Sequence, residues 1–152
     1  MVNGGDESVF LDTNILVYAN AAESPLHDAA LAAIETRYEV GIELWISRQI
    51  LREFLAVLSR PQRFTSPRPI STPIERVRFF ENHFHVAEDD PRVTEKLLDL
   101  LQQVSIGGKQ IHDANIVATM QTYGIQLLLT YNTSDFVRFS AFMTVAPLES
   151  VT

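Results

Sequence analysis

The chain of 152 residues contains no cysteine. Disulfide bonds and thiolate metal sites are therefore excluded, and the reducing cytoplasm is the favoured compartment. No apolar run is long enough to span a bilayer, and the N-terminus lacks both the basic start and the apolar core of a signal peptide. These absences predict a cytoplasmic protein that does not contact a membrane.

Positive charge is also scarce. Twelve Lys and Arg residues face 19 Asp and Glu residues, which gives a formal net charge of −7. A protein that holds a long nucleic acid through backbone charge is normally basic. Any contact with nucleic acid is therefore expected to be local, short or assisted by metal ions, and the acidity is equally explained by solubility.

The hydrophobic content of the chain is 46% and its charged content is 20%. A chain of this length and composition forms one ordinary globular domain with a substantial core. We expect that domain to cover residues 8–148, between a disordered segment at 1–7 and a C-terminal tail at 149–152. No internal repeat or domain linker interrupts it.

Short apolar strands alternate with segments of helical periodicity, which is typical of a parallel α/β sheet. Strands are expected at residues 9–11, 44–46, 84–87, 126–130 and 143–145. Helices are expected at 15–19, from a Ser24 N-cap to Gly41, from a Ser47 N-cap to Pro61, from a capping box at Thr72 to about Asn82, from Asp90 to Val104, and from Asp113 to Tyr123. The helix that begins at Asp90 is expected to bury Val93, Leu97, Leu98, Leu101 and Val104.

The first strand, Val9-Phe10-Leu11, runs directly into Asp12. In a parallel sheet, ligands collect just beyond the carboxyl ends of the strands, and Asp12 would lie at that point. A carboxylate beside a core cannot stay unpaired without a large desolvation cost. Asp12 therefore either caps the next helix or binds a cation.

Three further acids can be placed near the same edge of the sheet. Glu53 lies at the edge of an apolar stripe, Asp113 is aligned with the buried face of its helix, and Asp135 follows a strand. Each also has a simpler interpretation, as a solvated surface residue for Glu53, an N-cap for Asp113 and a turn cap for Asp135. Thr130 and Asn132 are polar where a buried strand would otherwise continue apolar, and we interpret them as hydrogen-bond partners of the acids.

Four converging acids would repel one another and raise each other's pKa values, so such a cluster is stable only with a cation. Ligand sets made of oxygen alone select Mg²⁺ or Mn²⁺ over zinc. A hard ion in that position lowers the pKa of a water and neutralises charge on a phosphate. The acids therefore indicate hydrolysis of a phosphodiester without a nucleophilic side chain.

With these residues the chain resembles a PIN domain, most closely the VapC-type toxins of bacterial toxin–antitoxin pairs. The matching segments are residues 10–18, 52–55, 107–116 and 128–136, in the family's order and spacing. By this resemblance, the acidic quartet corresponds to Asp12, Glu53, Asp113 and Asp135, and the supporting polar positions correspond to Thr13, Asn14, Thr130 and Asn132. The resemblance implies a three-layer α/β/α sandwich around a mainly parallel sheet of four to five short strands. It also implies Mg²⁺- or Mn²⁺-dependent endoribonuclease activity, frequent dimers and neutralisation by a cognate antitoxin.

Local contacts with RNA phosphates are expected from a small set of basic residues, whose alternative is an ordinary solvated face. The candidates are Arg48, Arg52, Arg60, Arg63, Arg68 and Lys109. Phe64 is an aromatic residue that either stacks on a base or packs in the core. His112 adjoins Asp113, but a lone histidine there is more often a packing residue, and it is not included among the ligands.

Two other functions are compatible with the sequence. The first is a PIN fold that binds RNA or a protein without cleaving RNA. The presence of all four acids favours a nuclease over this function. The second is an α/β protein that accepts a phosphoryl group on Asp12. That chemistry needs a second acid two residues away or paired acids before the nucleophile, and Asn14 and Phe10-Leu11 occupy those positions.

Overall fold

The computed structural model describes residues 7–60 and 69–149. Most of the two predicted terminal segments therefore lies outside the described residues. Three candidate contacts in the loop after Arg60 also lie outside them, namely Arg63, Phe64 and Arg68.

The core of the protein is a sheet of five parallel strands in the order β3-β2-β1-β4-β5. The strands are β1 (Ser8–Leu11), β2 (Glu43–Ser47), β3 (His85–Ala87), β4 (Leu127–Thr130) and β5 (Thr144–Pro147). Phe10 in β1 lies between Trp45 of β2 and Leu128 of β4, and is fully buried. A central parallel strand is covered on both faces, which explains the apolar run Val9-Phe10-Leu11 in β1.

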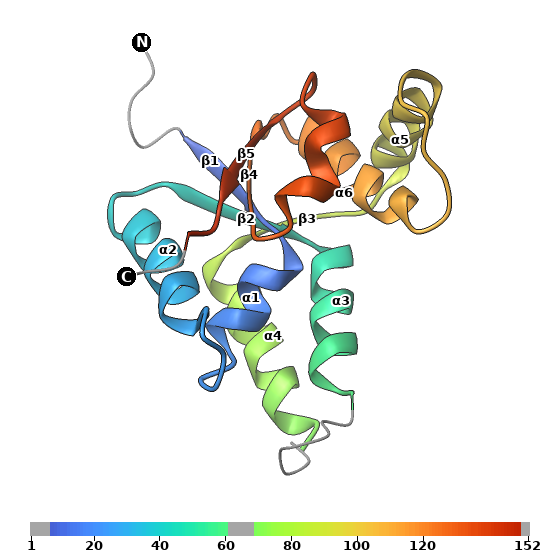
Figure 1. Ribbon diagram of the computed structural model, residues 1–152. Helices are drawn as coiled ribbons and strands as arrows, with labels where there is room; N and C mark the ends of the chain where they lie inside the picture. Colours follow the sequence, from blue (N-terminus) through green and yellow to red (C-terminus); the bar gives the residue numbers. More distant parts are fainter. Residues whose placement is uncertain (1–6, 61–68, 150–152) are drawn as a thin grey trace.

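Helices cover both faces of this sheet. They are α1 (Thr13–Ala19), α2 (His27–Glu39), α3 (Arg48–Leu58), α4 (Ser71–His83), α5 (Pro91–Gln103), α6 (Gln110–Thr122) and the 3₁₀ helix η2 (Thr133–Phe139). Figure 1 shows α1 to α4 on one side of the sheet and α5, α6 and η2 on the other. The predicted three-layer α/β/α architecture is confirmed. No helix among the described residues is long and apolar enough to cross a membrane.

The strand order reverses between β1 and β4. From β1 the chain adds β2 and then β3 on one side, whereas β4 and β5 lie on the other. In an open parallel sheet, the crevice for a ligand forms at the carboxyl ends of the strands where the order reverses. Asp12 directly follows β1, and Asp135 lies in the helix η2 that follows β4.

At two helices, the capping side chain that the sequence predicted does not begin the helix. Ser24 does not start α2; its hydroxyl accepts a hydrogen bond from the Leu26 N–H at 3.1 Å, and α2 begins at His27 without a side-chain cap. The capping box predicted at Thr72 is also wrong, because α4 already begins at Ser71. Proline is tolerated in a first helical turn, where backbone N–H groups have no intrahelical acceptor, so Pro73 does not delay the start of the helix.

Helix α6 begins at Gln110, three residues earlier than expected. The N–H groups of Gln110 and Ile111 donate to the carbonyls of Gly107 and Gly108, so a turn built on the two glycines leads directly into the helix. Gly108 has a positive φ of 59° there, a conformation that glycine adopts without strain. Asp113 is therefore in the first turn of α6 and is not its N-cap.

The buried face of α5 also differs from the prediction. Its start at Asp90 and Pro91 is confirmed, since the Asp90 carboxylate accepts from the Arg92 N–H. However, Leu98 is 49% exposed, while Val93 and Leu100 are buried. A stripe at residues 93, 97, 100 and 104 has helical spacing, and Leu98 lies about 100° away from it.

Candidate active site

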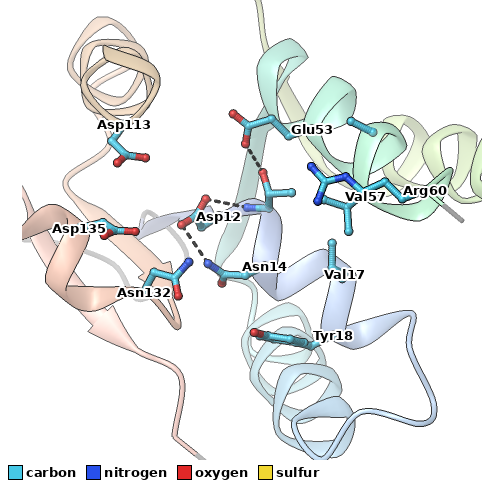
Figure 2. Close-up of a pocket in the computed structure, with 12 residues that line it drawn as sticks. Asp12, Asn14, Val17, Tyr18, Glu53, Val57, Arg60, Asp113, Asn132 and Asp135 are labelled. Atoms are coloured by element: carbon cyan, nitrogen blue, oxygen red, sulfur yellow. Dashed lines mark hydrogen bonds between the residues drawn. The ribbon is translucent and has the colours of Figure 1, made fainter. Parts of the chain in front are cut away.

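A cleft of about 450 Å³ opens at the point where the strand order reverses. Four carboxylates from separate segments line it, and they are Asp12 after β1, Glu53 of α3, Asp113 of α6 and Asp135 of η2. Figure 2 shows Asp12 at the centre, with Asp113 and Asp135 on one side and Glu53 above. The four acids singled out in the sequence therefore share one cavity.

Asp12 is both the N-cap of α1 and a wall of the cleft. Its Oδ1 accepts from the Thr13 N–H at 2.8 Å, and its Oδ2 accepts from the Thr130 hydroxyl at 2.8 Å and the Asn14 amide at 3.2 Å. Only 7% of the residue is exposed. Burial raises the pKa of Asp12, although the hydrogen bonds from Thr130 and Thr13 act in the opposite direction.

Thr130 is the point at which the polar residues after β1 and β4 meet. While its hydroxyl donates to Asp12, the same oxygen accepts from the Asn132 N–H at 3.0 Å and from the Asn14 amide at 3.3 Å. Asn14 also accepts from the Tyr131 N–H through its Oδ1 at 3.1 Å. These bonds fix the carboxylate of Asp12 relative to the segment that carries Asp135.

Glu53 is held by donors on both of its oxygens. The Thr13 hydroxyl donates to Oε2 at 2.6 Å, and the Gln49 amide donates to Oε1 at 2.9 Å. Thr13 belongs to α1 and Gln49 to α3, one turn before Glu53. The orientation of Glu53 is therefore fixed before any ligand binds.

Asp113 and Asp135 differ from Asp12 and Glu53 in their hydrogen bonding. Within residues 7–60 and 69–149, neither carboxylate makes a side-chain hydrogen bond, and both point into the cleft (Figure 2). Partial burial raises the pKa of Asp113 to about 6, and the negative charges of Asp135, Asp12 and Glu53 add to the shift. Mutual repulsion among the acids is therefore already present in the folded protein without a ligand.

The donor chemistry of the cleft fits a hard divalent cation. Its titratable lining consists of carboxylates with Tyr18 and Arg60, and the His112 side chain is not part of it. No group of three or more carboxylate or imidazole residues among the described ones is close enough to form a ready-made metal cage. Mg²⁺ fits such an open site, because it keeps several waters and is usually bound directly by only one or two carboxylates.

Arg48, one of the candidate RNA contacts, is engaged by acids of its own chain. Its guanidinium donates to Glu81 at 2.8 Å and to Glu88 at 2.9 Å. These groups are about half exposed, so the pairs add little stability, but they orient Arg48 toward α4 and the start of α5. Arg48 does not line the cleft.

The other basic candidates among the described residues differ in whether they line the cleft. The Arg52 guanidinium lies 3.8 Å from Asp89, and Lys109 is exposed just before α6, so neither lines the cleft. Arg60, directly after α3, does line it. Of the described basic candidates, Arg60 is thus the one placed beside the acids.

Gln49 and Asn115 are two residues that the sequence interpretation missed. Gln49 is 6% exposed, and its amide donates both to Glu53 and to the His112 carbonyl at 2.9 Å. Asn115 in turn donates to the Gln49 Oε1 at 2.8 Å. Gln49 therefore links Glu53 on α3 to the first turn of α6, which carries Asp113. The available signal for Gln49 was a polar residue four positions before Glu53. To recognise its role, one must also know which segment packs against α6.

For the Mn²⁺-dependent cleavage of RNA that the sequence resemblance implies, Gln49→Leu is expected to reduce the rate by about 10- to 100-fold and to raise the Mn²⁺ concentration needed for half-maximal rate. The substitution leaves Glu53 without one of its two donors and removes the hydrogen bonds that join Gln49 to the His112 carbonyl and to Asn115. Cleavage rates measured across a Mn²⁺ titration test this, with exposed Gln102→Leu on α5 as the matched control. A loss of rate with an unchanged Mn²⁺ requirement would indicate a structural effect alone.

The sequence comparison gives the family. The profile of the PIN domain matches residues 9–141, and the chain belongs to the PIN domain family. Ribonuclease VapC24 of Mycobacterium tuberculosis is 26% identical over 142 residues, which are 92% of this chain and 97% of the relative.

Solved structures agree on the fold. A toxin–antitoxin complex from Klebsiella pneumoniae contains a chain with a TM-score of 0.66 and 21% identity, covering 94% of this chain and 99% of that one. VapC20 of Mycobacterium tuberculosis, described as a toxin that cleaves the sarcin–ricin loop, has a TM-score of 0.66 and 16% identity. That match covers 89% of this chain and 95% of VapC20. The predicted PIN fold is confirmed.

Proposed function

We propose that this protein is a metal-dependent endoribonuclease and the toxin of a type II toxin–antitoxin pair. The observation that carries the proposal is the convergence of Asp12, Glu53, Asp113 and Asp135 in one cleft of a PIN fold. A relative that matches nearly the whole chain is named a ribonuclease. The bound antitoxin of the Klebsiella pneumoniae complex supports a protein partner for this chain as well.

The four acids would hold a Mg²⁺ or Mn²⁺ ion. When bound, that ion neutralises charge on the scissile phosphodiester and lowers the pKa of a water, which makes hydrolysis possible without a nucleophilic side chain. Asp113 and Asp135 present carboxylates without hydrogen bonds from the described residues, so they are available to a ligand. Thr13 and Gln49 hold Glu53 in one orientation, so little reorganisation is required when the substrate binds.

The neutral polar residues of the cleft have a positioning role in this proposal. Thr130 and Asn14 donate to Oδ2 of Asp12, which favours the ionised form and opposes the effect of burial on its pKa. Asn132 lines the cleft and is fixed through its N–H to Thr130. These contacts link Asp12, after β1, to the segment that carries Asp135.

Single-stranded or looped RNA is the proposed substrate. The acids lie in a cleft at the end of the sheet, and a phosphate reaches them only where the backbone is free of a partner strand. The net charge of −7 argues against charge contacts with a long stretch of RNA backbone. An antitoxin segment that offers a basic side chain to the acids would block the same cleft. Dimerisation of the chain stays a prediction.

Incubation of the purified protein with total RNA tests the proposal. Cleavage products are expected with Mg²⁺ or Mn²⁺, none in EDTA, and a return of cleavage when Mn²⁺ is added in excess. Equal cleavage in EDTA and Mn²⁺ would contradict a metal-dependent enzyme. Tight RNA binding without any product under either condition would instead favour a PIN-fold binding module.

A further inference from the structure

The cleft that holds the acids has a second half with different chemistry. Figure 2 shows it across the cleft from Asp113 and Asp135. The residues that line this half are Val17 and Tyr18 of α1, Ala56 and Val57 of α3, and Arg60. Binding of a metal ion does not require apolar side chains there. Partly exposed aliphatic groups remain in contact with water until an apolar ligand covers them, so this wall is suited to a ligand with an apolar face.

Along α3, the chemistry of this wall changes from acidic to apolar and then to basic. Glu53, Ala56, Val57 and Arg60 are spaced at i, i+3, i+4 and i+7, so they lie along one side of the helix. The Arg60 N–H donates to the Val57 carbonyl at 3.3 Å, which continues the last turn. Seven residues correspond to roughly 10 Å along a helix axis. A ligand lying on this surface meets an acid, then an aliphatic patch and then a cation.

Tyr18 is an aromatic group fixed at the edge of this wall. Its ring makes an edge-to-face contact with Tyr131, with the ring centroids 5.7 Å apart and an interplanar angle of 89°. The Tyr131 N–H donates to Asn14, whose amide in turn donates to Asp12. The ring is thus held in a constant position relative to the acids, which lowers the entropic cost of stacking a ligand on it.

We propose that Val17, Tyr18, Val57 and Arg60 form a nucleotide subsite next to the acids. An unpaired base of RNA lies against the valines and the Tyr18 ring, and the Arg60 guanidinium binds the phosphate that follows. The proposal rests on the proposed function, because it assigns the nucleotide beside the scissile phosphate. The cleft volume of about 450 Å³ is within the range of small-molecule sites and accommodates a nucleotide.

The charge pattern favours RNA over a peptide as the ligand of this wall. Arg60 is the one cation among the described residues that line the cleft. A basic side chain bound at the acids supplies no negative charge to Arg60, whereas a polynucleotide places a phosphate there and its scissile phosphate beside the metal site. A single-stranded site of this kind combines a stacking platform with a backbone cation.

Binding of two probes by four variants tests the subsite. The probes are fluorescein-labelled oligo(A) about 12 nucleotides long and an abasic ribose-phosphate oligomer of equal length, a size within the range of single-stranded sites. Anisotropy is measured with Ca²⁺ in place of Mg²⁺, and gels confirm that the probes stay intact. The test variants are Tyr18→Leu and Arg60→Gln. Their matched controls are Tyr38→Leu on α2 and Arg78→Gln on α4, both exposed and outside the cleft.

Tyr18→Leu is expected to weaken oligo(A) binding about tenfold and abasic binding by less than about twofold, because only the first probe has bases to stack. Arg60→Gln is expected to weaken both probes and to reduce the slope of log K against log salt by about 0.7, the value for one phosphate contact on a single strand. The two controls are expected to bind like the wild type. If Tyr18→Leu does not fold, as judged by circular dichroism, Val57→Ser replaces it with the same expected preference.

Three results would overturn the subsite. They are equal weakening of both probes by Tyr18→Leu, an unchanged salt slope in Arg60→Gln, and wild-type RNA binding in both variants. Wild-type RNA binding in both variants, together with weaker binding of a third probe, an oligo-arginine peptide, in Tyr18→Leu, would assign the wall to a protein ligand instead. If the wild type cleaves RNA while both variants bind normally, the subsite fails and the nuclease stands. If the expected binding pattern appears without any cleavage, the nuclease fails and the subsite stands.

Discussion

Asp113→Asn is expected to lower RNA cleavage by about a thousandfold or more, because a metal ion at a phosphodiester supplies several kcal/mol of charge stabilisation in the transition state. The substitution keeps the size of the side chain and removes one negative charge from the proposed ligand set. Asp113 makes no side-chain hydrogen bond within the described residues, so the change to an amide disrupts no internal partner. Initial cleavage rates of a defined RNA in Mn²⁺ measure the effect.

The same substitution is expected to stabilise the protein in EDTA at pH 7. The pKa of Asp113 is raised to about 6 in the folded protein, from an ordinary value of 3.8. A carboxyl group with a raised folded-state pKa contributes its stabilisation below pH 3.8 and loses it as the pH rises through about 6. At pH 7 the charge of Asp113 therefore opposes folding, and its removal raises the melting temperature.

This combination separates a catalytic effect from unfolding. A protein that loses activity while becoming more stable has lost chemistry and has kept its structure. Asp99→Asn on α5, an exposed acid outside the cleft, is the matched control and is expected to change neither quantity. Full activity in Asp113→Asn would remove Asp113 from the proposed site.

Saturating Mn²⁺ is expected to raise the melting temperature by roughly 5–10 °C relative to EDTA. An ion that binds only the native state at about 100 times its Kd stabilises that state by about 2.7 kcal/mol. For a domain of this size, each kcal/mol shifts the melting temperature by about 2–4 °C. The physical source of the effect is the relief of repulsion among Asp12, Glu53, Asp113 and Asp135, which line one cleft.

Thermal unfolding followed by circular dichroism measures the shift, with Na⁺ at matched ionic strength as the control for screening. Asp113→Asn is expected to show a smaller shift than the wild type, since one of the repelling charges is absent. An unchanged melting temperature between EDTA and millimolar Mn²⁺ would contradict a cation site among these acids.

The alternation of short apolar strands with helices was sufficient to predict the parallel sheet, whereas its three layers were implied by the resemblance to PIN domains. Local chemistry also placed several helix starts correctly, for example Ser47 before α3 and Asp90 with Pro91 before α5. It failed at Ser24, because α2 begins only at His27, and at Thr72, which lies inside α4 because that helix already begins at Ser71. A capping side chain is a weak local preference, and the turn that precedes the helix overrides it.

The sequence was sufficient to place the four acids relative to the predicted strands and helices. It was not sufficient to predict the hydrogen bonds that orient their side chains. Thr130 donates to Asp12 across 118 residues, Gln49 donates to the His112 carbonyl across 63, and Thr13 donates to Glu53 across 40. Hydrophobic periodicity reports only neighbours within one or two turns of a helix.

The sequence by itself determined a buried first strand that runs into Asp12, the parallel α/β class and the set of candidate acids. Only the tertiary structure decided that Gln49 links Glu53 to α6, that Glu81 and Glu88 engage Arg48, and that Arg60 lies beside the acids. The physical reason is that burial and local spacing are properties of each segment alone. Hydrogen bonds and charge contacts between segments depend on how the packed sheet brings distant strand ends together.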